Sequence, residues 1–464
     1  MTGFQIVVLW SDVLIWLLVA AGIGVGVLIA RSPPLLSAWR RVGASRVGMA
    51  SAVVLIAFAL IGLVDSLHYR SQLDGKRGQT TVYSVEVLSL LDALVTPLRT
   101  RNEKTYSEPF ATRLYAKETI DLPGQQGTVR DYPRLKYGGR HLGEREDEVA
   151  ADVAVTAFRA AVLAFLVWLA VAGVVAQAVA RDGSGWQKVW RGETAFAWNA
   201  LLITLGLILL ITVPLFSLAG QYHVFGTDKV GQDVLYQVLK SVRTGLIIGL
   251  VTTLVMLPMA VLLGIVAGYF RGWIDDVIQY VYTVLNSIPG VLLIAAAVLM
   301  MQVVIDTHPQ WFSTAAERAD LRLLALCFIL GITSWTGLCR LLRGETLKLR
   351  ELEYIQAAQA FGVSNWRIIV RHILPNLMHI VIIALVMDFS GLVLAEAVLS
   401  YVGIGVDPSM TSFGTMINSA RMELGREPVV WWSLAAAFTA MFILVLAANI
   451  FADAVRDAFD PRAA

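Results

Sequence analysis

The sequence predicts an all-α, polytopic membrane protein with about nine transmembrane helices. Of its 464 residues, 57% are hydrophobic and only 16% are charged, and the mean hydropathy is +0.67. Soluble globular domains are usually about 25% charged, so this chain has too few charges to cover a soluble surface of its size. It also contains nine apolar runs of the length, roughly 20 residues, that is needed to cross a bilayer core of about 30 Å.

The apolar runs are separated by polar connections, all but one of them short. The runs lie near 6–30, 47–66, 153–180, 196–219, 241–269, 278–304, 322–340, 374–402 and 430–452. The first run has no basic residue ahead of its apolar core and no clear small-residue cleavage site, so we interpret it as a span and not as a signal peptide. Cys327 and Cys339 lie about 18 Å apart along one helix, too far for a disulfide, and are expected to pack in the interior.

The one long polar connection, 67–150, is predicted to be a small extramembrane insertion. It holds 13 Lys and Arg residues, a similar number of acidic residues and many Pro and Gly turn signals. Its few aliphatic runs argue against a large core. We therefore divide the chain into 1–66 with two spans, the insertion 67–150, 151–195 with a third span and a linker, and 196–464 with the remaining spans.

Basic residues are distributed unequally between the two sides of the membrane. With nine spans, alternate connections share a side of the membrane and so form two sets. One set, together with the C-terminal tail, holds sixteen Lys and Arg residues. The short connections of the other set hold about five. Because cytoplasmic loops carry an excess of Lys and Arg, the first set, which includes 340–371, is predicted to be cytoplasmic. The N-terminus and the 67–150 insertion are then expected outside and the C-terminus inside.

Glycine and proline mark special positions in two spans. The fifth span contains two G-x-x-x-G pairs, formed by Gly245, Gly249, Gly264 and Gly268. Such pairs let helix backbones approach closely, which suits a pore-side or subunit-interface helix and equally suits packing within one bundle. In the sixth span, Ser287, Pro289 and Gly290 predict a kink.

The segment 344–376 has an unusual pattern for a connection between spans. Gly362 interrupts a helical pattern, and Pro375 with Asn376 marks the return to the bilayer. A short cytoplasmic helix, a break and a second helical stretch are therefore expected. The small pair Ala357 and Ala358 suits a helix that docks in the groove of a soluble partner; the alternative is an amphipathic helix that lies on lipid.

The same segment resembles the cytoplasmic coupling loop of binding-protein-dependent ABC importer permeases. The resemblance is carried by the Ala pair, by Gly362 four residues after it and by Leu374-Pro375, with Gln356 where the family usually has Glu and His372 where it usually has Ile. The string 371–376, R-H-I-L-P-N, is similar to the dipeptide and oligopeptide subfamily. Four further segments follow the family pattern in order: 226–233, 268–275, 394–403 and 453–462. The resemblance covers about 190–462, and the first 190 residues depart from the usual short form.

This resemblance implies a fold and a function. The fold would be a six-helix type I permease core, extended by N-terminal helices and an external insertion, with a coupling helix at 350–366. The chain would form half of the pathway for peptides or a related small solute; related permeases carry nickel, opines, sugars or antimicrobial peptides. The implied partners are a second permease subunit in a heterodimer, two ATPase domains or subunits, an extracytoplasmic solute-binding protein and the lipid of a bacterial inner membrane. Because the chain has no G-x-x-x-x-G-K-[ST] phosphate cradle, ATP and Mg are expected on the ATPase subunits and no cofactor on this chain.

Three groups of residues are candidates for function. Those expected to transmit the ATPase motion are Arg350, Glu351, Glu353, Tyr354, Gln356, Ala357, Ala358 and Gly362. Those expected at the translocation path are Asn286, Asp388 and Glu396, because polar and ionisable groups in a span are costly and usually face a cavity or partner; internal hydrogen bonding is the alternative. Those expected at the external mouth are Gly226, Thr227, Asp228, Gly231 and Asp233, where Asp228 could instead cap a helix.

Other functions have less support in the sequence. The six histidines show no metal-ligand spacing, and neither a catalytic constellation nor a nucleic-acid-binding pattern is visible, so no metal, no nucleic acid and no enzymatic activity are expected. The alternatives are a secondary transporter, and a membrane-anchored sensor or enzyme whose active domain is 67–150. In the importer interpretation this insertion docks the binding protein or packs against the second permease; otherwise it is a solvated connector.

Overall fold

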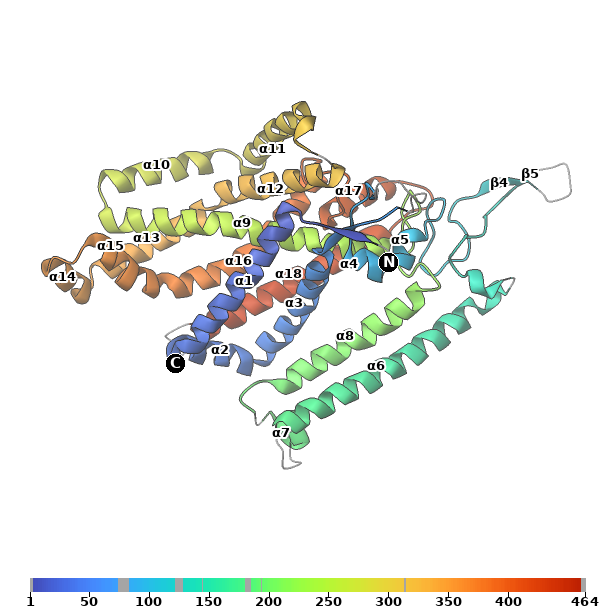
Figure 1. Ribbon diagram of the computed structural model, residues 1–464, viewed down its shortest axis with the longest axis horizontal. Coiled ribbons are helices and arrows are strands. Elements are labelled where there is room, and N and C mark those ends of the chain that lie inside the picture. The colour runs from blue at the N-terminus through green and yellow to red at the C-terminus, as the bar shows by residue number, and fades with distance from the viewer. Residues whose placement is uncertain are drawn as a thin grey trace. The chain divides into compact units, whose positions relative to one another are not determined.

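Helices dominate the computed structural model, which describes residues 3–73, 83–121, 128–143, 145–179, 185–192, 194–312 and 314–459. Within these residues, nine helices are long and apolar enough to cross a membrane (Figure 1). They are Trp10–Arg31, Arg46–Asp65, Glu146–Val179, Trp198–Ala219, Val234–Phe270, Gly290–Thr307, Ala315–Arg350, Asn365–Tyr401 and Trp432–Phe459. The predicted all-α membrane fold is confirmed.

The chain forms two compact units, each assembled from several parts of the sequence. The first contains Met1–Val8, Ala30–Thr244 and Thr411–Ile450, and the second contains Leu9–Ile29, Gly245–Met410 and Phe451–Ala464. Three long helices have residues in both units: α1 (Trp10–Arg31), α9 (Val234–Phe270) and α18 (Trp432–Phe459).

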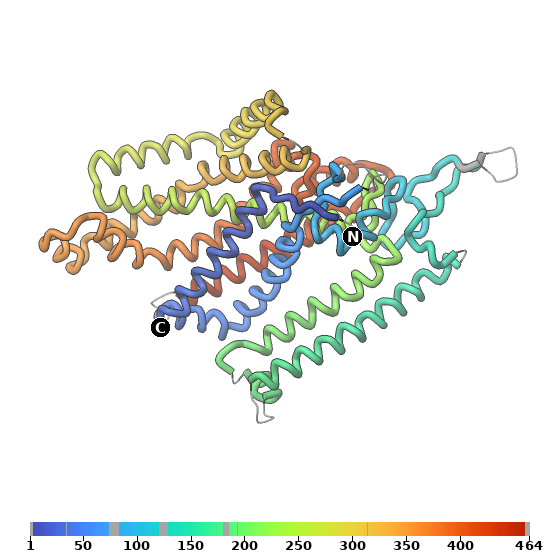
Figure 2. The backbone as a smooth tube through the Cα atoms, in the orientation of Figure 1, coloured from blue at the N-terminus to red at the C-terminus, as the bar shows by residue number. Residues whose placement is uncertain are grey.

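The first unit joins the second, third and fourth spans to the insertion. Its helices are α2 (Pro33–Ala44), α3 (Arg46–Asp65), α4 (Leu90–Leu94), α5 (Thr96–Thr100), α6 (Val149–Val179), α7 (Gly185–Arg191), α8 (Trp198–Ala219) and α17 (Phe413–Glu423), with the short turns η1 (Arg140–Leu142) and η2 (Glu146–Glu148). Helix α6 runs along α8, and α8 also packs on α3 (Figure 2). The third predicted span, in α6, is therefore held in this unit by contact with α8.

Short strands tie the start of the chain to the insertion. Strand β1 (Phe4–Val7) pairs antiparallel with β2 (His68–Ser71), which pairs with β3 (Leu88–Ser89). In the register, Phe4 lies opposite Ser71 and Val7 opposite His68. A separate antiparallel pair is formed by β4 (Glu118–Asp121) and β5 (Thr128–Asp131). The residues before the first span and those after the second span therefore share one side of the membrane.

The second unit is a bundle with its own core. Its elements are α10 (Trp273–Ser287), α11 (Gly290–Thr307), η3 (Pro309–Trp311), α12 (Ala315–Ser334), α13 (Thr336–Arg350), α14 (Glu353–Ala360), α15 (Asn365–Ile368), the π-helical turn η4 (Ile369–Ile373) and α16 (Leu374–Tyr401). The core is formed by apolar residues of α9, α10, α13 and α16, together with Ile355, Ile368 and Ile373 from the connection between α13 and α16. Cys327 and Cys339 are both buried and free, as expected.

The predicted sixth span, 278–304, is wrong as a single kinked helix. Helix α10 ends at Ser287 and α11 begins at Gly290, with Ile288 in an extended conformation between them. Pro289 accounts for the break, because proline disfavours the helical conformation of the residue before it. In this region only α11 is long and apolar enough to span.

Three of the four glycines of the fifth span serve packing within the chain. A Cβ atom on Gly264 would lie 2.8 Å from the Cys339 carbonyl oxygen, and one on Gly268 would lie 2.6 Å from Cβ of Thr346. A Cβ atom on Gly249 would lie 2.3 Å from the ring of Phe389. Small residues therefore let α9 approach α13 and α16 closely. Of the two interpretations of the G-x-x-x-G pairs, these contacts favour packing within one bundle.

Candidate functional site

The connection between α13 and α16 contains the predicted coupling helix, α14, followed by a tight turn. Gly362 has φ +74°, and the chain closes the helix end with hydrogen bonds from Gly362 N to the Gln359 oxygen (3.0 Å) and from Val363 N to the Ala358 oxygen (3.1 Å). A left-handed residue just past the helix end is the conformation that glycine adopts without steric cost. A Cβ atom on Gly362 would meet nothing within 4 Å, so backbone conformation alone explains the glycine.

The coupling loop, 351–366, is firmly attached to the bundle. Ile355 is completely buried, and Ala358 and Val363 pack against the same core. The Tyr269 hydroxyl donates to Oδ1 of Asn365 (2.9 Å) and accepts from the side-chain amide of Gln359 (3.3 Å). These contacts hold α14 to the end of α9, so a force on α14 would be passed to the bundle.

Charged contacts reinforce this attachment. An ion pair joins Arg271, just past α9, to Glu351 (2.5 Å). The Arg350 guanidinium lies 5.9 Å from the centre of the Tyr269 ring, and the Tyr354 hydroxyl accepts a hydrogen bond from Asn376 (3.1 Å). Glu351, Arg350 and Tyr354 therefore make contacts within the chain.

The exposed face of the coupling loop differs in part from the prediction. Most of the predicted residues are exposed, whereas Ala358 packs toward the core. The exposed ones are Glu351, Glu353, Tyr354, Gln356, Ala357 and Gly362. Sequence reasoning missed Phe361 and Trp366, which are 87% and 65% exposed. Their signal was available: two large aromatic side chains in a polar connection, one directly before the glycine turn. Exposed aromatic groups of this kind are common anchors of protein interfaces.

The predicted external-mouth residues form a compact loop before α9. One carboxylate oxygen of Asp228 accepts hydrogen bonds from the backbone N–H groups of Val230 (3.0 Å) and Gln232 (2.9 Å). Asp233 accepts from Leu235 N (2.8 Å) at the start of α9. Asp233 and not Asp228 is therefore the helix cap. Both carboxylates stabilise the loop itself.

The insertion covers this loop through direct backbone contact. Glu103 N donates to the Gly231 oxygen (2.9 Å), and the Thr227 hydroxyl accepts from Ser107 N (2.7 Å). A Cβ atom on Gly231 would lie 1.9 Å from the Glu103 oxygen, and one on Gly226 would lie 2.4 Å from the Ser107 oxygen. Only glycine permits this approach at either position, since both also have positive φ, +69° at Gly226 and +76° at Gly231.

A buried charged triad joins the insertion to the same loop. Nδ1 of His223 lies 2.8 Å from Asp233, and Nε2 lies 3.4 Å from Glu103 of the insertion. Glu103 also accepts from the backbone N–H groups of Lys136 (2.8 Å), Tyr137 (2.8 Å) and Gly138 (3.1 Å). Burial alone would lower the pKa of His223, but the hydrogen bonds and charges of the two carboxylates raise it to about 9. The triad is therefore an imidazolium between two carboxylates at neutral pH.

A second cluster ties α9 to the N-terminal part of the chain. Nζ of Lys240 lies 2.6 Å from Asp65 at the end of α3 and 3.3 Å from Asp92 of the insertion. The Tyr236 hydroxyl donates to Asp92 (2.8 Å). Burial would raise the pKa of Asp92, but Lys240 and the hydrogen bonds to the carboxylate lower it below its ordinary value. The sequence had placed none of these residues in a site.

The predicted translocation residues lie on two helices, Asn286 on α10 and both Asp388 and Glu396 on α16. Glu396 is buried and accepts a hydrogen bond from Ser400 (2.5 Å) on its own helix. Asn286, near the end of α10, accepts from the Thr336 hydroxyl of α13 (3.1 Å). Asp388 is half-buried on α16. Glu396 and Asn286 thus match the alternative of internal hydrogen bonding.

Within the described ranges, no group of three or more histidines, cysteines and acidic residues could hold a metal ion.

Comparison with known proteins places the second half of the chain in a family of transporters. The family described as "Binding-protein-dependent transport system inner membrane component" matches residues 260–464. A glutathione transport system permease protein of Pectobacterium atrosepticum is 33% identical over 242 residues, which are 52% of this chain and 73% of the relative. A dipeptide transport system permease protein of Lactococcus lactis is 30% identical over 52% of this chain and 64% of the relative. An oligopeptide transport system permease protein of Mycobacterium bovis is 31% identical, over 52% and 77% respectively.

Proposed function

Because the chain belongs to the family of binding-protein-dependent transport system inner membrane components, we propose that it forms half of the translocation pathway of an ABC importer for short peptides. It is a multi-pass membrane permease, as the resemblance implied. The names of its relatives specify glutathione, dipeptides and oligopeptides as their solutes. These solutes share a short peptide backbone, which supports that class for this chain. A second permease subunit completes the pathway.

ATP hydrolysis on separate ATPase subunits drives transport through the coupling loop. The observation that carries this proposal is the form of the loop: Ile355 is buried in the bundle while Phe361 stands 87% exposed beyond α14. A rigid element with an exposed aromatic anchor is suited to a groove on a partner protein. The chain has no phosphate-binding loop of the Walker type, so ATP and Mg belong on the ATPase subunits.

The proposed orientation has the N-terminus and the insertion outside and the C-terminus in the cytoplasm. The excess of basic residues in one set of connections supports it. The pairing of β1 with β2 supports one part of it, namely that the N-terminus and the insertion share a side. On the outside, an extracytoplasmic solute-binding protein delivers the solute.

The coupling proposal is tested by replacing Phe361 with Ser in cells that produce the complete importer. Uptake of a labelled peptide should fall, while the amount of the chain in the membrane stays unchanged. The matched control is Trp186→Ser, which removes a half-exposed aromatic side chain (42% exposed) from α7, in another predicted cytoplasmic connection. Normal uptake by the Phe361 variant would exclude this residue from ATPase coupling.

A further inference from the structure

Two spans of the first compact unit, α3 and α8, begin side by side on one side of the membrane (Figure 1). The backbone joins the two starts directly, because Ala197 N, just before α8, donates to the oxygen of Gly43 near the end of α2 (2.8 Å). A Cβ atom on Gly43 would also lie 2.6 Å from the Phe196 ring. The proposed orientation places these helix starts in the cytoplasm. Each start carries partial positive charge from the helix dipole.

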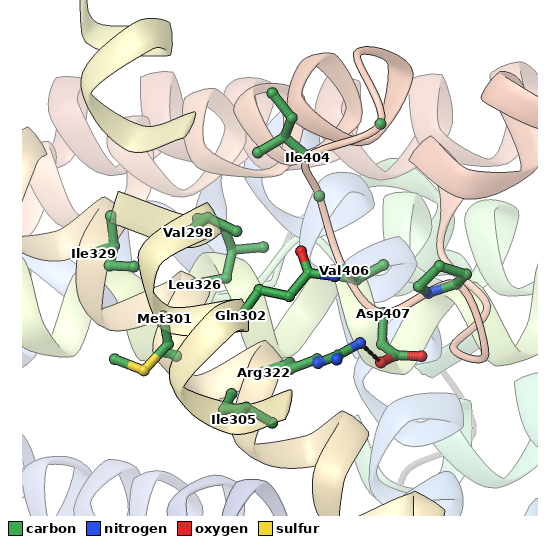
Figure 3. Close-up of a pocket in the computed structure, with 14 residues that line it drawn as sticks. Val298, Met301, Gln302, Ile305, Arg322, Leu326, Ile329, Ile404, Val406 and Asp407 are labelled. Atoms are coloured by element: carbon green, nitrogen blue, oxygen red, sulfur yellow. Dashed lines mark hydrogen bonds and ion pairs between the residues drawn. The ribbon is translucent and has the colours of Figure 1, made fainter. Parts of the chain in front are cut away.

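The connections that lead into these two helices are strongly basic. In the sequence, 31–46 contains four arginines and no acidic residue, and 181–195 contains three basic residues against two acidic ones. The arginines that are exposed and form no ion pair with the described residues are Arg31, Arg40, Arg41, Arg46 and Arg191. Arg322 of α12, by contrast, is paired with Asp407 (Figure 3). The surface at the starts of α3 and α8 therefore attracts anions.

Donors from both helices meet at one point of this surface, beside Gly192. A Cβ atom on Gly192 would lie 3.7 Å from a terminal nitrogen of the Arg46 guanidinium and 3.7 Å from Nδ2 of Asn199. Apart from the chain neighbours of Gly192, the described residues place no other heavy atom within 4 Å of that position. Arg46 is the first residue of α3 and Asn199 the second of α8. The point therefore combines a guanidinium, a side-chain amide and two helix starts.

The Asn199 side chain supplies a donor that the protein itself does not use. Asn199 is only 8% exposed, and its Oδ1 accepts from Ala200 N (2.8 Å). Among the described residues, its Nδ2 has no acceptor. This nitrogen faces the same open point as Arg46, so an anion placed there accepts hydrogen bonds from both. Phosphate oxygens form strong, charge-assisted hydrogen bonds with such donors.

An exposed apolar stripe on α8 begins at the same point. Ile203, Leu207 and Ile211 are exposed. They follow Asn199 at intervals of four residues and therefore share its side of the helix. The first residue of α8 is Trp198, a residue type that is enriched where the membrane meets water. A phosphate site with an apolar stripe leading from it into the membrane fits a phospholipid better than a free anion or an acidic protein.

We propose that the starts of α3 and α8 bind the headgroup of an anionic phospholipid such as phosphatidylglycerol. The phosphate lies between Arg46 and Asn199, and an acyl chain lies along the stripe on α8. The surrounding arginines favour a lipid with net negative charge over a zwitterionic one. This site lies outside residues 260–464, which match the transporter family, and it does not depend on the solute. It gives the N-terminal spans a role in holding the protein to anionic lipid.

The test measures binding of dioleoylphosphatidylglycerol to the purified protein in detergent by native mass spectrometry, with dioleoylphosphatidylcholine as the zwitterionic reference. Asn199→Asp keeps the oxygen that accepts from Ala200 N but replaces the donor with a negative oxygen. It should lower the apparent affinity for phosphatidylglycerol by about tenfold, a typical effect of losing a hydrogen bond to a charged group. Arg46→Gln should have a similar effect. The control is Arg130→Gln, which removes an exposed arginine from β5 and should bind this lipid as the wild type does.

The outcomes separate the lipid from other anions. Equal affinity of the wild type for the two lipids would overturn the proposal, and so would unchanged phosphatidylglycerol binding by both variants. Thermal stabilisation by inorganic phosphate as large as that by phosphatidylglycerol would identify a free anion as the ligand instead. Weaker copurification of Arg46→Gln with the ATPase subunits, with lipid binding unchanged, would identify a protein interface and would also overturn the proposal. Because Arg46 is exposed, Arg46→Gln decides the question if Asn199→Asp does not fold.

Discussion

Glu103 and His223 are 120 residues apart in the sequence, and Oε1 of Glu103 lies 3.4 Å from Nε2 of His223. Both side chains are buried. One belongs to the insertion and the other to the segment that leads into α9, so their contact attaches the insertion to the permease part of the chain. A mere solvated connector would need no such contact.

The attachment of the insertion should weaken at alkaline pH. The pKa of His223 is raised from its ordinary 6.5 to about 9, so its contribution to stability is complete below about pH 6.5 and is lost as the pH rises through about 9. In detergent, proteolytic cleavage within 83–143 should be slow near neutral pH and should accelerate as the pH passes about 9. In His223→Gln this acceleration should be absent, because the variant has no imidazole to titrate there. Equal pH dependence in both proteins would contradict the role of the triad.

The Lys240 cluster should be strongly stabilising. Lys240→Met leaves the carboxylates of Asp65 and Asp92 without their cation, and breaking such a pair costs about 3 kcal/mol. We expect a clear decrease in the thermal unfolding midpoint of the purified protein. Lys229→Met, at an exposed position nearby in the sequence, is the control and should leave the midpoint unchanged. A similar midpoint for both variants would show that the cluster contributes little.

Much of the fold could be predicted from the sequence because bilayer thickness sets the length of an apolar run. Most of the spans, and the short helix that ends just before Gly362, follow from local patterns. The contacts of Glu103 and Lys240 could not be predicted, because they join carboxylates and cations far apart in the chain and have no periodic signal. The break at Pro289 was read as a kink because the apolar pattern continues through it. Glu396 is predicted at the path because it is ionisable within an apolar run, and the structure adds a hydrogen bond to it from Ser400, one turn further along α16.

The turn at Gly362 should be needed for ATPase coupling. Valine at this position must adopt φ near +74°, which is strained for a β-branched residue, although its side chain would meet no neighbour. We expect Gly362→Val to insert normally and to lose most peptide uptake, and Gly362→Asn to retain more, because asparagine tolerates this conformation better. Gly344→Val, a helical site where a Cβ atom also meets nothing, controls for side-chain bulk. Wild-type uptake by Gly362→Val would remove the turn from the coupling mechanism.

The proposed orientation can be tested with cysteines placed on each side. Ser107 lies in the insertion but is completely buried, so it is a poor reporter, whereas the Lys104 side chain is 71% exposed. A membrane-impermeant thiol reagent should label Lys104→Cys in spheroplasts. It should label Ser364→Cys, in the exposed coupling loop, only after the membrane is permeabilised. Labelling of Ser364→Cys alone would reverse the topology.

The insertion should be required for assembly or solute delivery. Deleting roughly 75–145 and joining the ends with a short flexible linker removes Glu103 and Asp92, so His223 loses one carboxylate and Lys240 loses one of its two. It also uncovers Gly226 and Gly231, whose conformations fit the backbone of the insertion. We expect loss of peptide uptake and weaker copurification with the second permease or the binding protein. A smaller deletion of 119–130 keeps every one of these contacts, so it should preserve assembly. The same variant shows whether the region of β4 and β5 is needed for the binding protein. If assembly, binding-protein affinity and uptake all survive the large deletion, the insertion is only a connector.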